Sequence, residues 1–156
     1  MKFSLLPAIA LALAAVLAAQ SLPAPPKKDV PYIIHATSLV EVEQNEAVPQ
    51  EDKKQLIYYV PGASSGVVTP LGFPEFLFAP DQIDVRSLEL YRFEPVEGRR
   101  EILIRKKKKN VAQPYFIDVF PHAEGVMRIR VDGSLSSGEY CLTPNGSDKV
   151  FCFTVS

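Results

Sequence analysis

The end of the chain decides how the rest of it folds: it reads L-S-S-G-E-Y-C-L at residues 135–142, T-P-N-G-S-D at 143–148 and K-V-F-C-F-T-V at 149–155. The two outer segments contain most of the aromatic and β-branched residues of this stretch, whereas Pro, Asn and Gly stand between them. Residues of the first kind suit a pleated surface, and residues of the second kind form turns. The sequence therefore predicts an antiparallel hairpin whose last strand is Val150–Val155.

The length of the hairpin loop determines where the two cysteines of the chain lie. If residues 145–148 form a four-residue loop, Cys141 faces Cys152 directly, at a separation that suits a disulfide bond. A two-residue turn at 145–146 would instead place Cys141 opposite Val150 and leave the thiols diagonal to one another. An oxidising compartment would favour the disulfide Cys141–Cys152, and two half-buried free thiols are the alternative.

The pattern L-x-x-G-x-Y-x-L at 135–142 resembles the turn into strand F of immunoglobulin-like and fibronectin-type β-sandwiches. This resemblance implies that Tyr140 is a corner tyrosine whose hydroxyl bonds to nearby backbone, that Leu135 fills the core before the turn, and that Gly138 allows a tight backbone. The sequence has no tryptophan, and no cysteine lies in a plausible strand B. An antibody-type domain is therefore excluded, whereas the broader bacterial immunoglobulin-like class is not.

Short apolar runs separated by turn signals continue upstream of the hairpin, and beyond residue 19 Val and Ile outnumber Ala and Leu. This pattern predicts an all-β protein, a two-layer antiparallel immunoglobulin-like β-sandwich with a solvated acidic loop at Gln44–Lys54. The further expected strands are Tyr32–Thr37, Leu39–Glu43, Gln55–Val60, Val67–Thr69, Phe76–Phe78, Leu88–Phe93, Arg100–Arg105, Tyr115–Phe120 and Val126–Val131. One core is expected, containing Met127, Ile129, Val131, Tyr140, Leu142, Phe151 and Phe153.

The first residues of the chain are typical of a secretory signal peptide. Lys2 precedes an apolar run from Leu5 to Ala19, and small residues offer a cleavage site near Ala18–Gln20. A transmembrane anchor is the alternative, but the run includes Pro7 and is only about 15 residues long, whereas a spanning helix needs about 20. We therefore expect a cleaved signal peptide and a secreted or periplasmic mature protein with no transmembrane span.

A chain of 156 residues can bury a sizeable core as one domain. We expect a signal peptide at 1–19, a Pro-rich leader at 20–31 and a single β-sandwich domain at 32–156. With 17 basic and 18 acidic side chains, the formal net charge is −1. This balance argues against a general nucleic-acid binder, for which a strong positive charge would be expected.

The densest run of positive charge is a candidate anion-binding patch. It consists of Arg99, Arg100, Arg105, Lys106, Lys107, Lys108 and Lys109. Such a run would concentrate anions from an envelope surface, such as a phospholipid or lipopolysaccharide, or from an acidic polysaccharide. One alternative is edge protection, because lysines along an exposed strand prevent it from pairing with another copy. Another is neutralisation, within the fold or in a neighbouring copy, by the acidic residues Glu41, Glu43, Glu46, Glu51 and Asp52. A protein partner is a further expectation that the sequence leaves open.

Catalytic and metal-binding signals are weak in comparison. Residues Gly62–Gly66 fit the G-x-S-x-G motif of α/β-hydrolases, and Asp118 and His122 follow Ser64 in the chain order of that family. The motif needs a helix after the serine, but V-V-T-P follows at 67–70. The two histidines show no zinc-site spacing. We therefore expect no catalytic residue, metal or cofactor.

These observations favour a non-catalytic protein that binds or scaffolds at the cell envelope. A small secreted serine hydrolase that uses Ser64 is the alternative function.

Overall fold

The computed structural model describes residues 21–156, so the expected signal peptide lies outside the described residues. The described part of the chain is all-β, as predicted. Its strands are β1 (Tyr32–His35), β2 (Ser38–Glu41), β3 (Glu43–Glu46), β4 (Val48–Glu51), β5 (Gln55–Pro61), β6 (Val68–Thr69), β7 (Glu75–Phe78), β8 (Leu88–Val96), β9 (Arg99–Lys106), β10 (Lys109–Asn110), β11 (Ile117–Ala123), β12 (Val126–Val131), β13 (Gly138–Pro144) and β14 (Lys149–Val155). Residues 21–156 contain no helix that is long and apolar enough to cross a membrane.

The strands form two sheets, and the pairings within them are antiparallel apart from the parallel pair β6 and β14. One sheet has the order β11-β12-β7-β1-β2, and the other has the order β3-β14-β13-β8-β9-β5-β4. Within them, β1-β7-β12-β11 corresponds to the A-B-E-D sheet of an immunoglobulin-like sandwich, and β8-β13-β14 corresponds to its C-F-G sheet. The chain therefore folds as the antiparallel β-sandwich that its last strands predict.

A sandwich core fills the space between the sheets. Every member of the core predicted from the sequence lies in it, with Met127 partly buried at its margin. Phe76 of one sheet packs edge-on against Phe153 of the other, with ring centroids 5.2 Å apart. Aromatic pairs in this geometry add stability beyond the apolar area they bury.

The corner before β13 has the hydrogen bond that the resemblance implies. The Tyr140 hydroxyl donates to the Ser136 carbonyl at 2.8 Å, and Leu135 is buried in the sandwich core. Gly138 does not have a positive φ. A Cβ at this position would lie 2.9 Å from the Arg92 guanidinium, so the glycine makes room for that side chain.

The C-terminal hairpin has the register of the four-residue loop. Cys141 pairs with Cys152 across β13 and β14, and the two residues form a disulfide with a Cα–Cα distance of 4.1 Å. A disulfide is compatible with an extracytoplasmic protein, because such bonds persist in oxidising compartments.

The larger sheet curls back on itself, which the sequence analysis did not predict. β3 and β4 stand at opposite ends of its strand order, yet only Ala47 separates them in the chain. β3 pairs with β14 and β4 pairs with β5, so residues 43–51 close the curl. The expectation of a solvated loop at Gln44–Lys54 is therefore wrong. β4 is exposed along its whole length and lacks the apolar alternation by which a strand is recognised.

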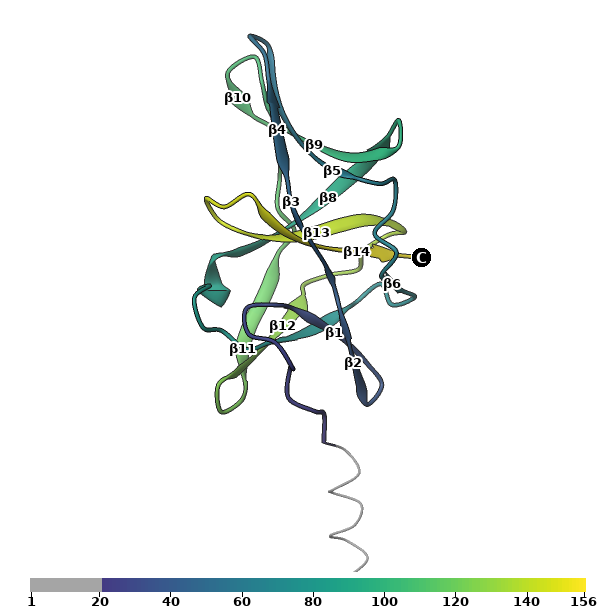
Figure 1. Cartoon of the computed structure of the whole chain (residues 1–156), viewed down its shortest axis with the longest axis vertical. Coiled ribbons are helices and arrows are strands. Elements are labelled where there is room, and N and C mark those ends of the chain that lie inside the picture. Colours follow the sequence, from purple (N-terminus) through teal and green to yellow (C-terminus); the bar gives the residue numbers. More distant parts are fainter. Residues whose placement is uncertain (1–20) are drawn as a thin grey trace, which may run out of the picture.

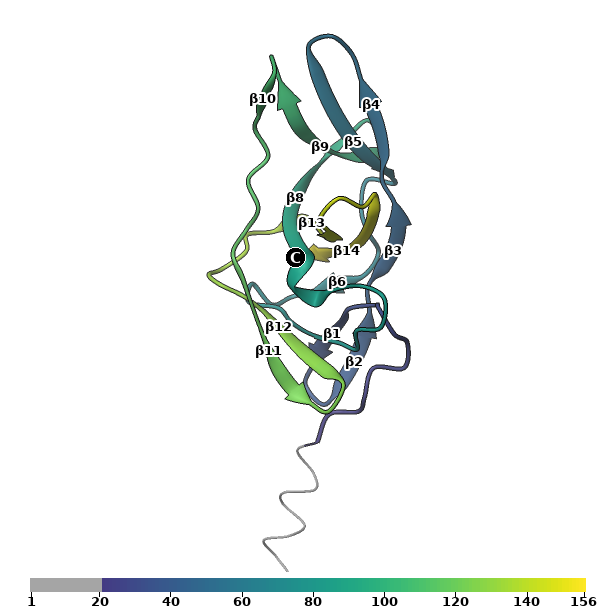
Figure 2. The ribbon, with the colours of Figure 1, turned by 90° about the vertical axis from the view of Figure 1, so that its left-hand side faces the viewer.

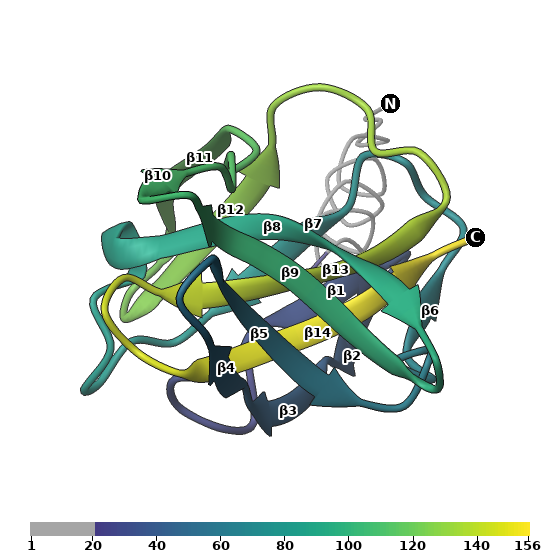
Figure 3. The same ribbon diagram turned by 90° about the horizontal axis from the view of Figure 1, so that it is seen from above.

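A second core lies inside this curl, so the expectation of a single core is also wrong. Its buried residues are Ala47, Val60, Phe93, Cys141, Val150 and Cys152. β13 and β14 consequently bury both of their faces, one in each core. Figure 3 shows β5 and β9 crossing over β13 and β14. The second core contains residues from both of these layers, such as Val60 of β5 and Cys152 of β14.

The end of the Pro-rich segment contacts the domain. The Asp29 carboxylate accepts hydrogen bonds from the backbone N–H groups of Asp81, Gln82 and Ile83, and Val30 is buried. Partial burial raises the pKa of Asp29, but the backbone N–H donors together outweigh burial and lower the pKa below its ordinary value. These bonds attach the segment to the loop that follows β7.

The molecule is elongated, and hairpins lie at both of its ends (Figure 1). The β4–β5 and β9–β10 hairpins project at one end, and the β1–β2 and β11–β12 hairpins lie at the other, as Figure 2 also shows. The first of these ends contains most of the predicted basic patch.

Candidate functional site

Arg100 does not belong to an exposed anion-binding patch, so this part of the prediction is wrong. Its side chain is fully buried and forms an ion pair with Glu43, with 2.7 Å between Nη1 and Oε1. The same guanidinium donates to the carbonyls of Pro61 at 2.7 Å and Gly62 at 2.9 Å. Alternate residues of β9 face inward, so Arg100 lies on the same side as Ile102, within the curl of the sheet.

The other two arginines of the predicted patch are partly neutralised on the surface. Arg99 forms an ion pair with Glu101, and its guanidinium lies over the Tyr59 ring at 4.1 Å from the centroid. Arg105 forms an ion pair with Glu51 at 2.8 Å. Their charges are therefore less available to a ligand than the charges of the neighbouring lysines.

The four lysines of the predicted patch are exposed and form the β9–β10 turn. Lys107 and Lys108 have φ values of 52° and 66°, as at the centre of a type I′ turn. Asn and Gly are favoured there, because a positive φ strains other side chains. Two lysines thus occupy positions where the backbone alone would favour Asn-Gly.

A second turn adds two lysines that the sequence analysis missed. Lys53 and Lys54 lie in the β4–β5 turn, and the Lys107 N–H donates to the Lys54 carbonyl at 2.8 Å, so the two turns are adjacent. We call the six side chains of Lys53, Lys54, Lys106, Lys107, Lys108 and Lys109 the lysine tip. Within residues 21–156, none of these six forms an ion pair with a carboxylate.

Asp52 is the acidic residue among the turn residues 52–54 and 106–110, and backbone N–H groups donate hydrogen bonds to its carboxylate. Its Oδ1 accepts hydrogen bonds from the N–H groups of Lys54 at 2.7 Å and Gln55 at 2.9 Å. These bonds lower the pKa of Asp52 below its ordinary value. The carboxylate thus stabilises the turn that presents Lys53 and Lys54.

The residues of the hydrolase alternative lie on different elements. The Ser64 hydroxyl is 3.2 Å from that of Thr154 in the larger sheet, whereas Asp118 and His122 belong to β11 in the other sheet. Asp118 faces Arg130 at 3.7 Å. In the described part of the chain, no hydrogen bond joins Ser64, Asp118 and His122, and no cluster of His, Cys, Asp and Glu is arranged to hold a metal ion.

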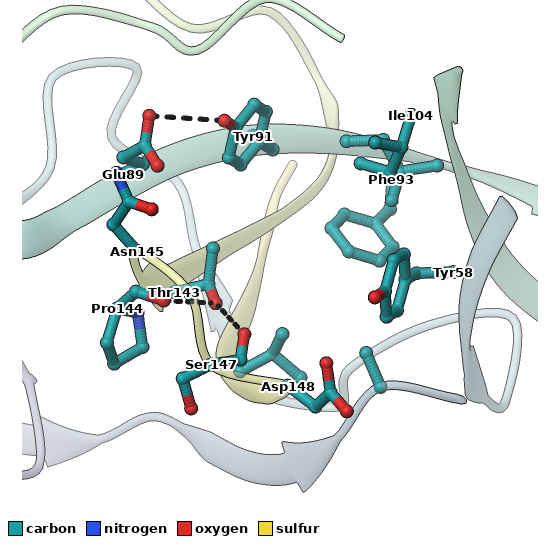
Figure 4. Close-up of a pocket in the computed structure, with 14 residues that line it drawn as sticks. Tyr58, Glu89, Tyr91, Phe93, Ile104, Thr143, Pro144, Asn145, Ser147 and Asp148 are labelled. Atoms are coloured by element: carbon teal, nitrogen blue, oxygen red, sulfur yellow. Dashed lines mark hydrogen bonds between the residues drawn. The ribbon is translucent and has the colours of Figure 1, made fainter. Parts of the chain in front are cut away.

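A pocket of about 260 Å³ opens beside the second core, and the sequence analysis did not foresee it. Tyr58, Tyr91 and Phe93 line it, together with polar side chains near the β13–β14 turn (Figure 4). These residues come from strands that are far apart in the chain, and only the curl of the sheet brings them together. No spacing within the sequence could therefore reveal the pocket.

No protein-family model, curated protein or solved structure matches this chain.

Proposed function

We propose that this protein is an extracytoplasmic, non-catalytic β-sandwich that binds an anionic polysaccharide through the lysine tip. The observation that carries the proposal is the convergence of six exposed lysines from two adjacent turns, without an ion-paired carboxylate within residues 21–156. Clustered cations raise the local concentration of a polyanion and steer its approach.

The chemistry of the tip favours a polysaccharide over a lipid bilayer. The turn residues 52–54 and 106–110 contain only Asp, Lys and Asn, so they supply no apolar side chain for insertion between lipids. The turns also form a narrow end of the molecule rather than a broad face (Figure 1). An extended anionic polysaccharide can lie across such an end, whereas a bilayer presents a broad flat surface. The disulfide favours an oxidising compartment, and the formal net charge of −1 argues against a nucleic acid as the polyanion.

Neutralising the tip should weaken binding to an anionic polysaccharide. We expect replacement of Lys106–Lys109 by Gln to lower the salt concentration that elutes the protein from immobilised heparin. Each lysine close to an anionic surface contributes about 1 kcal/mol, and salt screens this attraction over about 8 Å. A matched control replaces Lys27, Lys28, Arg86 and Arg130 by Gln, which removes the same charge elsewhere and should have a smaller effect.

Two results would contradict the proposal. One is a wild-type protein that shows no salt-sensitive retention on heparin. The other is equal loss of retention in the tip variant and the control variant, which would indicate a response to net charge alone.

If the wild type is not retained and the tip variant self-associates during gel filtration, the lysines protect a strand edge instead. Stronger binding to anionic vesicles than to heparin would indicate that the lysine tip binds a membrane surface rather than a polysaccharide.

A further inference from the structure

The pocket beside the second core has the form of a binding site for a small molecule. Residues of β5, β8, β9 and the β13–β14 turn line its volume of about 260 Å³. Phe93 is buried in the second core, and Ile102 packs against this core. A concave site that is mainly apolar and carries a few polar groups is typical of ligand pockets.

Aromatic rings form much of its wall. Figure 4 shows Tyr91 on one side of the pocket and Phe93 and Tyr58 together on another. The Tyr91 hydroxyl donates to Glu89 Oε2 at 3.2 Å, which fixes the orientation of the ring. The faces of such rings carry negative electrostatic potential and attract cations.

The charged residues of the lining have one sign. Among the described residues that line the pocket, Glu89 and Asp148 are charged, and both are carboxylates. Within residues 21–156, neither forms an ion pair with Lys, Arg or His. The adjacent Lys149 ammonium lies 5.7 Å from the Phe151 ring centroid, and Phe151 belongs to the sandwich core rather than to the pocket.

We propose that this pocket binds a small organic cation of the alkylammonium class. The rings of Tyr58, Tyr91 and Phe93 contact the methyl or methylene groups of the cation, and Glu89 and Asp148 balance its charge. Aromatic walls with carboxylates beside them are the chemistry that distinguishes a substituted ammonium from a neutral molecule of the same shape. Burial and the Glu89 carboxylate raise the pKa of Tyr91, so this ring stays neutral and its hydroxyl continues to donate.

The test compares choline with 3,3-dimethyl-1-butanol, in which carbon replaces the charged nitrogen. Each is titrated into ¹⁵N-labelled protein, and amide shifts are followed by NMR. We expect choline at millimolar concentration to shift amides of residues 58, 89–93 and 145–150. The neutral analogue should bind at least tenfold more weakly. Equal binding of the two compounds, or no shift at these residues with choline, would overturn the proposal.

Variants then assign the roles of the side chains. Glu89→Gln can still accept the Tyr91 hydrogen bond but loses the charge, and it should weaken choline binding severalfold. Tyr91→Phe keeps the ring and should bind choline more tightly than Tyr91→Leu. Glu97→Gln, an exposed change in the β8–β9 turn, is the matched control and should leave binding unchanged. If Glu89→Gln binds as well as the wild type, the carboxylate has no role and the proposal fails.

The site is independent of the lysine tip, and the experiment separates the two. The variant with Gln at 106–109 should bind choline as the wild type does while losing affinity for heparin. Failure of choline binding together with normal heparin binding would refute the pocket alone, and the reverse would refute the tip alone.

Discussion

Replacing Arg100 with Met is expected to lower the free energy of unfolding by about 3–5 kcal/mol, the usual cost of breaking a buried ion pair. The Arg100 side chain is fully buried, and its partner Glu43 is 23% exposed. The variant leaves the Glu43 carboxylate without its partner, and the carbonyls of Pro61 and Gly62 also lose their donor. Urea denaturation followed by circular dichroism measures the loss.

Two companion variants distinguish the ion pair from a general effect of lost charge. Arg99→Met changes a neighbouring arginine on the surface and should cost less than about 1 kcal/mol. Arg100→Met combined with Glu43→Leu removes both charges and should recover part of the stability that the single change loses. If Arg100→Met costs no more than Arg99→Met, the buried ion pair of Arg100 with Glu43 does not contribute to stability as expected.

Removing the disulfide should cost about 3 kcal/mol. Cys141 and Cys152 are separated by 11 positions, and in the chain-entropy model a loop of this size constrains the unfolded chain by about that amount. The double variant Cys141→Ala/Cys152→Ala avoids an unpaired thiol in the second core. The stability of the double variant should be measured by urea denaturation beside that of the oxidised wild type.

Reduction provides the control for this prediction. When urea denaturation is repeated in the presence of a reductant, the free energy of unfolding of the wild type should fall to that of the double variant. The free energy of unfolding of the double variant should not change. A double variant as stable as the oxidised wild type would contradict the expected contribution of the bond.

The local parts of the fold could be predicted from the sequence, because neighbouring residues determine them. The loop at 145–148 sets the register of β13 against β14, and the Tyr140 corner spans only the four positions back to Ser136. The curl of the larger sheet could not be predicted in this way. It depends on β4 pairing with β5 and on β5 pairing with β9, and the polar composition of β4 concealed it.

The candidate site was predictable to a similar extent. The run at 106–109 is visible in the sequence, but its junction with Lys53 and Lys54 joins segments more than fifty positions apart. Arg100 looks like another surface cation until its partner Glu43, 57 positions earlier, is placed beside it. The aromatic pocket likewise depends on long-range pairing rather than on any motif.

Binding of heparin by the variant Lys107→Asn/Lys108→Gly tests the central claim most directly. Asn-Gly suits the positive φ values of this turn, so the variant should fold and gain about 1 kcal/mol of stability. The loss of two tip charges should nevertheless reduce its affinity for heparin at low salt by about 2 kcal/mol, close to thirtyfold. A more stable protein that binds more weakly is the result we predict, and unchanged affinity would contradict the proposed role of the lysine tip.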